Sequence, residues 1–562
     1  MALNLVSPGV RVKEIDLTIG RIDDINDQVG AIAGPFEKGP VNVPILVETE
    51  AELLDTFGSP KSADAQYEYW MTASAFLSYG GVLRVIRTSG EKLTNANAPV
   101  GAAVTNLSVE SSEDYFNNHT TDPDWHYAAR NPGSWANDLK VCVIDAKADQ
   151  RLAIGTDGLA VGYAVTAGFS TSVALTDGTV GVQTGFLKGL ITQINHGSFD
   201  VKILTKYDSS TNIWSDAEYE EGSSTTAFQG YDQGIFDWQE ANQTPNINYP
   251  NRIRIFNTSG VEQRVERTRF QATVGIGSTM IAFGTDLDTF KAHIGDQIKS
   301  LNGTYTGNIV GYTTDTDTKV IMDTAATVAF ANTDFIVSSG VGSGINLRVG
   351  NTATDWYQQQ KLGLSNSNLY WKNLASAPGT SAYAKDRNSR FDEIHVVVVD
   401  DTGSVTGTAG NVIEKWTGLS KASDAKISPS TATFYKDYIA NYSELIFAGA
   451  VESGSGLKFA SSSGYTVDAT GTWGQKAQGV TFNGIGAKAH TLASGSDYGS
   501  VGGYNVSLGD VVSSYTTLEN PAEYDINYLI QGPSGGSSIY EAQAKANKLI
   551  QIATTRKDCI AC

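Results

Sequence analysis

The last residues of the chain include two cysteines whose spacing could do chemistry. Cys559 and Cys562 have the C-x-x-C spacing of a redox pair or of half a zinc site. Zinc would need two more ligands at a similar spacing, and the remaining cysteine, Cys142, is isolated. A redox pair usually opens a helix, whereas this pair falls in a predicted strand. We therefore interpret these cysteines as structural.

A serine flanked by glycines has the spacing of a nucleophile elbow. Gly532-Pro-Ser534-Gly-Gly536 matches G-x-S-x-G and lies between a predicted strand and a predicted helix. An α/β-hydrolase places its acid and then its histidine after this serine, but no histidine follows His490. The pattern therefore favours a glycine-rich turn.

Three weaker patterns also have a structural explanation. Gly407-Thr-Ala-Gly410 precedes a predicted helix and could bind an anion, but no phosphate-binding lysine or ribose-binding carboxylate follows it. Asp315-Thr-Asp317 begins like a calcium loop, yet it has no glycine at the sixth position and no closing glutamate. His395 lies inside an apolar strand and is interpreted as a core histidine. The sequence therefore predicts no catalytic residue, no cofactor site and no metal site.

Length and composition limit the class of protein further. The chain has 562 residues, a net charge of −20 and three cysteines. This length predicts about three or four compact units. So few cysteines predict a reducing compartment without a disulfide framework. The acidic charge argues against nucleic-acid binding, and the sequence has neither a long apolar run for membrane insertion nor a signal peptide.

The two ends of the chain have the sequence pattern of an α/β protein. Apolar runs bounded by Gly and Pro predict strands, and apolar residues at helical spacing predict helices. In the first part, the predicted strands are 29–36, 43–47 and 82–86, and the predicted helices are 50–57 and 63–79. In the last part, the predicted strands are 391–400, 445–448, 524–530 and one from 556, and the predicted helices are 412–419, 508–518 and 538–553.

The middle of the chain is different in character. Short predicted strands alternate with Gly, Asn, Asp and Ser turns, a pattern typical of β-sandwiches and barrels. A single helix is considered at 286–294. We divide this region into two inserted β-rich units, 91–190 and 191–354.

Several segments resemble a known family, the tail sheath proteins of contractile-tailed bacteriophages (the myovirus tail sheath family). The similarity lies in the order and spacing of short motifs rather than in any one of them. In the first part these are SPGV at 7–10, FEKGP at 36–40, FG at 57–58, YGGVLRV at 79–85 and NPGSWAN at 131–137. Near the end they are EYDINYLIQGPSG at 523–535, AQAKANKLI at 542–550 and RKDCIA at 556–561.

The resemblance implies an α+β multidomain fold. An α/β sandwich core domain is formed by N-terminal and C-terminal segments, with β-rich domains (barrel or sandwich) inserted between them. The implied parts are an extended N-terminal arm at 1–22, core segments at 23–90 and 355–562, and the two inserted units. The second core segment includes a Gly/Ser-rich excursion at 453–503. Because sheath proteins normally continue past the RKDCIA-like strand, we expect this chain to lack the C-terminal end of the family.

The resemblance also implies a function. The chain would be a structural subunit, not an enzyme, that polymerises around a tail tube and contracts to drive the tube through the host envelope. Its implied partners are further copies of itself, the tail tube protein, and the baseplate and tail terminator proteins, with no nucleic acid and no membrane insertion. It would be assembled in the host cytoplasm and located in the virion tail.

The N-terminal arm would work by adding a strand to a sheet of a neighbouring subunit. The intersubunit residues would be Val10, Val12 and Ile15 as inward-facing anchors, and Arg11 and Lys13 facing solvent or acidic partners, with Pro8 and Gly9 setting the bend. Without the resemblance, a frayed terminus is the simpler interpretation.

A second hypothesis is a large soluble hydrolase with an α/β core and β-rich appendages. Its carbohydrate-active form would need paired carboxylates in an aromatic groove. Tyrosine and tryptophan are frequent enough to allow such a groove, but no acidic pair stands out in the sequence.

Overall fold

The computed structural model describes most of residues 28–562. The residues not described after position 27 are 63–65, 155–158, 175–179, 196–197, 224, 229–252, 259–261, 264–267, 270–275, 283–296, 301–305, 313–318, 328, 330–334, 340–348, 455–456, 459–467, 470, 500–502 and 534–537. Helices and sheets are both present, which confirms the α+β class in its coarse form. The helix considered at 286–294 lies outside the described residues.

One sheet is built from both ends of the described chain. Its five strands are β1 (Val29–Gly34), β2 (Ile45–Val47), β3 (Val82–Arg87), β29 (Tyr528–Leu529) and β30 (Ile560–Ala561), in the order β2-β3-β1-β29-β30. β1 pairs in parallel with β3 and β29, and β29 pairs in parallel with β30. A strand buried on both faces reads as a continuous apolar run, as β1 does.

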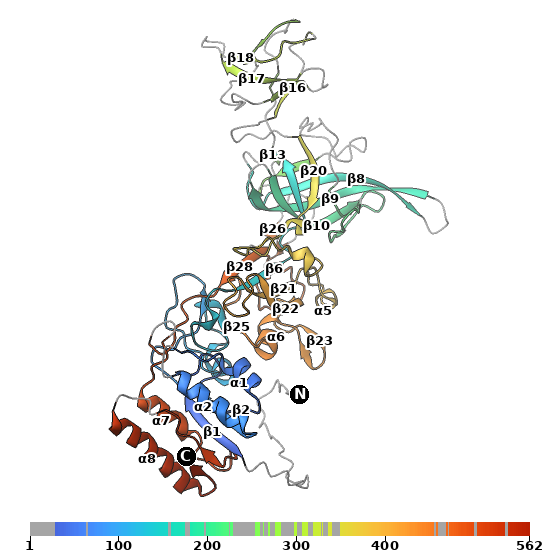
Figure 1. The fold of residues 1–562 in the computed structure, drawn as a ribbon. Helices are drawn as coiled ribbons and strands as arrows, with labels where there is room; N and C mark the ends of the chain where they lie inside the picture. The colour runs from blue at the N-terminus through green and yellow to red at the C-terminus, as the bar shows by residue number, and fades with distance from the viewer. Residues whose placement is uncertain are drawn as a thin grey trace.

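Helices lie on both faces of this sheet (Figure 1). They are α1 (Glu50–Phe57), α2 (Gln66–Ser78), α7 (Leu508–Thr516) and α8 (Ile539–Arg556). The alternation of side chains along β1 shows the arrangement, because Ile32 packs in the core formed with α1 and α2 whereas Ala31 and Ala33 pack in the core formed with α7 and α8. The sheet is therefore the middle of three layers.

A second region follows, with two small sheets that share a core. The four-stranded sheet has the order β22-β21-β6-β28, with β6 (Leu139–Asp145), β21 (Glu393–Asp400), β22 (Asn411–Ser420) and β28 (Ala487–Thr491). The three-stranded sheet has the order β25-β5-β4, with β4 (Asn97–Pro99), β5 (Trp125–Ala129) and β25 (Ile446–Ala448). The helix α6 (Tyr435–Tyr442) contributes Tyr435 and Ile439 to the shared core. Strands on both sides of the β-rich middle therefore pair with each other.

The helix predicted at 412–419 is wrong, because this segment is strand β22. It pairs antiparallel with β21 along its length, and the pairing contains two irregularities. The turn before it is fixed by the Asp400 carboxylate, which accepts hydrogen bonds from the N–H groups of Gly403, Val405 and Thr406. The apolar spacing of 412–419 also fits a helix, but pairing with β21 in a hairpin decides the structure of this segment.

The β-rich middle contains two larger sheets. The eight-stranded sheet has the order β13-β12-β8-β9-β10-β7-β20, with β11 on β10, and the six-stranded sheet has the order β14-β19-β16-β17-β18-β15. The first comprises β7 (Gln150–Ile154), β8 (Ala164–Ala174), β9 (Val180–Asn195), β10 (Ser198–Asp208), β11 (Ile213–Asp216), β12 (Ile253–Phe256), β13 (Glu262–Gln263) and β20 (Val349–Asp355). The second comprises β14 (Thr268–Arg269), β15 (Met280–Ala282), β16 (Gln297–Ser300), β17 (Thr306–Tyr312), β18 (Lys319–Met322) and β19 (Phe335–Ser339). β9 runs through residue 190, where the sequence analysis placed a boundary.

Short elements complete the described fold. They are the helix α3 (Ser112–Asp114), the π-helix η1 (Tyr115–His119), the 3-10 turns η2 (Ser134–Ala136), η3 (Tyr357–Gln359) and η4 (Trp371–Asn373), the helix α5 (Ala382–Lys385), and the hairpins β23 (Lys426–Ser428) with β24 (Thr431–Ala432) and β26 (Leu457–Lys458) with β27 (Asp468–Ala469). The regions follow one another along an elongated molecule, from α7 and α8 at one end to β16, β17 and β18 at the other (Figure 1).

A buried lysine joins the two halves of the three-layer region. Lys545 of α8 has no exposed surface, and its ammonium donates hydrogen bonds to the Tyr69 hydroxyl of α2 at 3.0 Å and to the Pro533 carbonyl at 2.9 Å. It also lies 4.6 Å from the centroid of the Tyr69 ring. Burial lowers the pKa of Lys545 to about 7, because the interior disfavours the charged form.

The free energy of unfolding should therefore rise with pH between about 7 and the ordinary lysine pKa of 10.5. In this window the unfolded chain holds a proton on residue 545 that the folded chain has released, so the slope approaches about 1.4 kcal/mol per pH unit. Urea unfolding at pH 7, 8 and 9 measures it. The variant Lys545→Met should lose this part of the slope, and equal slopes in both proteins would contradict the assignment.

Candidate functional site: a joint formed by the motif segments

Most of the candidate residues named from the sequence either lie outside the described residues or do not take part in a reactive arrangement there. The arm residues Pro8, Gly9, Val10, Arg11, Val12, Lys13 and Ile15 lie outside the described residues, as do Asp315, Asp317 and Ser534. Cys142, Cys559 and Cys562 are free cysteines. Burial raises the pKa of the Cys142 thiol to about 12, which makes it a poor nucleophile at neutral pH.

The histidine and glycine patterns have structural roles. His395 is a buried core histidine, as predicted: its Nε2 lies 2.8 Å from the Ser376 carbonyl, and its Nδ1 accepts a hydrogen bond from the Gly418 N–H. The segment 407–410 leads into strand β22 rather than a helix, so no helix N-terminus stands there to bind an anion. No group of His, Cys, Asp and Glu side chains in the described part of the chain is arranged to hold a metal ion.

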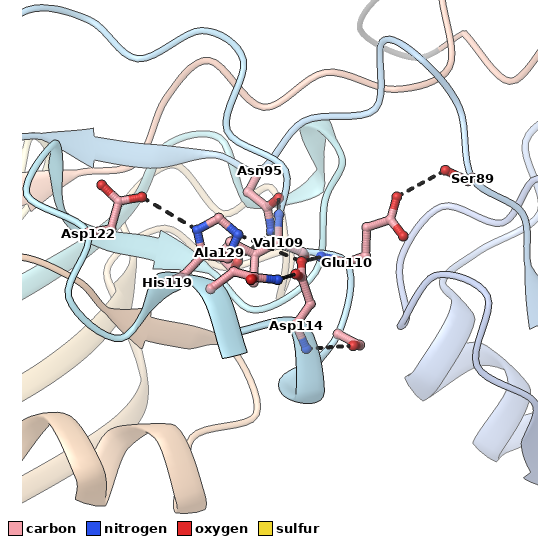
Figure 2. Close-up of polar contacts among 10 residues, drawn as sticks. Ser89, Asn95, Val109, Glu110, Asp114, His119, Asp122 and Ala129 are labelled. Atoms are coloured by element: carbon pink, nitrogen blue, oxygen red, sulfur yellow. Dashed lines mark hydrogen bonds and ion pairs between the residues drawn. The ribbon is translucent and has the colours of Figure 1, made fainter. Parts of the chain in front are cut away.

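His119 lies between two carboxylates at the end of the π-helix (Figure 2). Its Nδ1 is 3.4 Å from Asp122, and its Nε2 is 3.7 Å from Asp114. Asp114 also accepts a hydrogen bond from the Glu110 N–H, and Ser89 donates one to Glu110 (Figure 2). These contacts tie the loops around η1 together. The nearby serine hydroxyls are engaged elsewhere, because Ser111 caps α3 and Ser112 accepts a hydrogen bond from Arg130.

Glu452, His490 and His126 form a second cluster of titratable side chains, and no sequence motif predicts it. The Glu452 carboxylate is buried and lies 2.6 Å from His490 Nε2 and 3.8 Å from His126 Nδ1. Burial by itself raises the pKa of Glu452, but the contact with His490 and the charges of His126 and Lys488 outweigh it and bring the pKa below its ordinary value. The cluster links β5 with β28, which are far apart in the chain.

The motif segments converge on one side chain, Arg87. It is the last residue of β3 and is fully buried. Its guanidinium donates hydrogen bonds to the main-chain carbonyls of Phe36 at 2.8 Å, Glu37 at 2.9 Å, Gly39 at 3.0 Å and Pro132 at 2.6 Å. Three of these carbonyls belong to the FEKGP segment and the fourth to the NPGSWAN segment. The fork of donors on a planar guanidinium suits this arrangement.

The FEKGP segment is also held by the FG motif that follows α1. The rings of Phe36 and Phe57 pack with centroids 5.2 Å apart. The Glu37 carboxylate accepts hydrogen bonds from the N–H and hydroxyl of Ser59 and pairs with Lys61 at 2.6 Å. A side chain at Gly58 would collide with Glu37, and its φ of 82° also favours glycine. Two separate motifs therefore form one turn structure.

The NPGSWAN segment connects this turn structure to the second region. Gly133 has a φ of 133°, and a Cβ there would lie 3.0 Å from the Glu37 carbonyl. The N–H and hydroxyl of Ser134 donate to the Asp497 carboxylate. The Asn137 amide exchanges two hydrogen bonds with the main chain of Gly495, at 3.0 and 2.9 Å. We call this arrangement of residues 36–39, 87, 131–137 and 495–497 the Arg87 joint.

The Arg87 joint can position parts of the molecule, but it offers no reactive group. It connects β3 of the five-stranded sheet, the start of β6 and the segment after β28. The motif segments are visible in the sequence, whereas the roles of Arg87 and Asp497 are not. Nothing in their local sequence distinguishes them from surface charges.

The comparisons with known proteins match only parts of the chain. No protein-family profile matches it. The tail sheath protein of Enterobacteria phage T4 is 34% identical over 104 residues, which are 18% of this chain and 15% of that protein. The tail sheath protein of Vibrio phage KVP40 is 36% identical over 104 residues, with the same coverage. That of Salmonella phage ViI is 30% identical over 142 residues, which are 25% of this chain and 21% of that protein.

Among solved structures, one similarity is to the sheath tail protein of Desulfitobacterium hafniense. The identity is 15%, the matched part covers 35% of this chain and 34% of that one, and the TM-score of 0.14 is too low to support an argument about the fold. The described residues include no helix long and apolar enough to cross a membrane.

The three sequence matches agree on one class of protein, a structural component of bacteriophage tails. Within that class they support the family that the sequence motifs indicated, the phage tail sheath proteins. Each match spans about a fifth or less of its relative's length, between 15 and 21%.

The variant Arg87→Met should be strongly destabilised, because it leaves four carbonyl groups of the Arg87 joint without their donor. We expect a loss of about 3 kcal/mol or more in the free energy of unfolding. Arg87→Lys should not restore it, since an ammonium cannot reach both segments as a fork does. The measurement is urea unfolding followed by tryptophan fluorescence.

Arg84 on the same strand provides the control. It is half-buried, donates one hydrogen bond of 3.3 Å to the Asp525 carbonyl and lies over the Tyr524 ring. Arg84→Met should cost about 1 kcal/mol or less. Similar losses for the two methionine variants would show that Arg87 has no special role.

Proposed function

We propose that the chain is a structural subunit of a contractile bacteriophage tail sheath. It would polymerise around the tail tube and contract to drive the tube through the host envelope. The observation that carries this proposal is the match of separate relatives, all tail sheath proteins, to a chain whose motif segments form one buried joint. The relatives favour a non-enzymatic role, and no observation favours the hydrolase alternative.

The proposed assembly contact is strand addition. Residues 2–15 would leave their own subunit and pair with a sheet of a neighbour, with Val10, Val12 and Ile15 as anchors and Pro8 and Gly9 at the bend. The five-stranded sheet offers suitable acceptors, because its outer strands are β2 and β30. Leu46 on β2 is 45% exposed and Ile560 on β30 is 63% exposed. Unpaired main-chain N–H and C=O groups at such edges provide affinity for an added strand. Exposed apolar side chains there make the contact specific for the sequence of that strand.

The proposed contraction needs no nucleotide. Residues 16–27 would act as a flexible connection that keeps the subunits linked while their bodies rotate. An assembled state held by the tube and baseplate would relax to one that buries more surface between subunits. The tail tube, baseplate and tail terminator proteins would be the partners, and the virion tail the location after assembly in the host cytoplasm.

The experiment that tests this proposal is assembly of the protein, viewed by negative-stain microscopy beside its tail tube. The protein should form tubes or stacked rings. Deletion of residues 1–15 should abolish them, because the added strand is lost, while the circular dichroism spectrum and thermal unfolding stay the same. Tubes formed by the deletion variant would refute the arm.

A matched pair of variants tests the assignment of the arm residues. Val10→Glu with Val12→Glu places charges on the face proposed to pack on the neighbour, and it should prevent tubes. Arg11→Ser with Lys13→Ser changes the opposite face, and it should leave tube formation nearly unchanged. The reverse outcome would assign the inward face to the charged residues.

A further inference from the structure

The four-stranded sheet that contains β6 and β21 is called the β21 layer from here on. The eight-stranded sheet meets this layer at a buried group of charged and aromatic side chains. We call Asp149, Lys202, Arg390 and Phe391 the coupling cluster. Each has less than a tenth of its surface exposed. Asp149 lies between β6 and β7, where the chain enters the eight-stranded sheet, and Lys202 belongs to β10. Arg390 and Phe391 lie immediately before β21 in the other layer.

Arg390 joins the two layers directly. Its main chain belongs to the β21 layer, where its N–H donates to the Val480 carbonyl at 2.9 Å. Its guanidinium reaches into the eight-stranded sheet, where it donates to the main-chain carbonyls of Leu204, at 2.9 Å, and Ala217. The same guanidinium pairs with Asp216 of β11 at 3.1 Å. One side chain therefore holds β10 and β11 on the neighbouring layer.

Phe391 is the strained residue of the cluster. Its φ is 60°, a conformation that is a genuine outlier for a bulky side chain. Two cations lie over its buried ring: Lys202 Nζ, 3.8 Å from the centroid, and Arg390 Cζ, at 4.7 Å. Its carbonyl accepts a hydrogen bond of 3.0 Å from Lys421, which is fully buried. Contacts from both layers thus hold the ring and the main chain.

The charge of Lys202 is balanced within the cluster. Its ammonium lies 2.6 Å from one oxygen of Asp149, and the other oxygen accepts the N–H of Ile203 at 2.7 Å. The main-chain carbonyl of Asp149 accepts the N–H of Trp356, at the point where the chain returns from β20. The segment that enters the eight-stranded sheet at Asp149 and the segment that leaves it at Trp356 are therefore hydrogen-bonded to each other beside the Lys202–Asp149 pair.

These features share one physical consequence. Backbone strain at a residue such as Phe391 is unfavourable, and it persists only where the surrounding contacts hold the residue in that conformation. Buried ion pairs add little net stability, but they penalise every arrangement in which the partners separate. A contact between two layers that contains both a strained residue and buried ion pairs permits only one orientation of one layer relative to the other.

We propose that the coupling cluster is a rigid coupling that fixes the orientation of the eight-stranded sheet on the β21 layer, so that both turn as one body. Any rotation of the β21 layer is then transmitted to the projecting sheet. The inference does not depend on sheath assembly, since it concerns contacts within one chain.

The test measures the distance between nitroxide labels on the two layers by pulsed electron spin resonance. The exposed residues Ser215 of β11 and Thr417 of β22 are replaced by cysteine for labelling, with Cys559 and Cys562 changed to serine. Phe391→Leu removes the ring but keeps an apolar side chain. Lys202→Met with Asp149→Asn removes both charges, and the asparagine oxygen can still accept the Ile203 N–H. Each should widen the distance distribution by about twofold or more.

The control is an exposed ion pair nearby, between helix α5 and the segment that follows β11. Lys385 and Glu218 lie 3.6 Å apart and are 58% and 40% exposed. Lys385→Met should leave the distribution unchanged, because exposed pairs contribute little. Phe391→Gly covers the case in which Phe391→Leu fails to fold, since glycine accepts the positive φ without strain. A distribution that stays narrow in the folded cluster variants, or widens equally in the control, would overturn the coupling.

Discussion

Buried basic side chains govern how distant segments of this chain meet. Arg87, Lys421 and Lys545 each have no exposed surface. A charge removed from water must find hydrogen-bond acceptors, because the alternative costs several kcal/mol. Few acceptors lie on the cation's own element, so loops from other parts of the chain must come to it. For Arg87 the acceptors are four main-chain carbonyls, and the result is a joint between segments that lie about fifty residues before and after Arg87 in sequence.

The same constraint repeats along the length of the molecule. Lys545 links α8 to α2 in the three-layer region, the Arg87 joint links that region to the next, and the coupling cluster links the β21 layer to the eight-stranded sheet. Each link uses polar groups inside an apolar core, which favours one orientation over many. In the proposed sheath subunit, which would rotate as a body while its ends stay bound to neighbours, such links would keep the body rigid.

The residues that resembled reactive groups also belong to this structural chemistry. His395 connects β21 to the Ser376 carbonyl and the Gly418 N–H, and the turn at Gly407 closes the hairpin between β21 and β22. The Glu452 carboxylate, which had no motif, links two sheets through His126 and His490. Within the described residues, titratable groups are therefore used to join elements.

The sequence by itself determined the elements whose signals are local. The predicted helices 50–57 and 508–518 correspond to α1 and α7, which Thr49 and Ser507 cap, and the apolar run at 391–400 contains buried strand β21. The tertiary structure decided the rest. It made 411–420 a strand because β21 needed a partner, it carried β9 through residue 190, and it brought Arg87 to Pro132 and Arg390 to Leu204. Caps and periodicity act within a few residues, whereas sheet partners and the acceptors of a buried charge are chosen by packing across the whole chain.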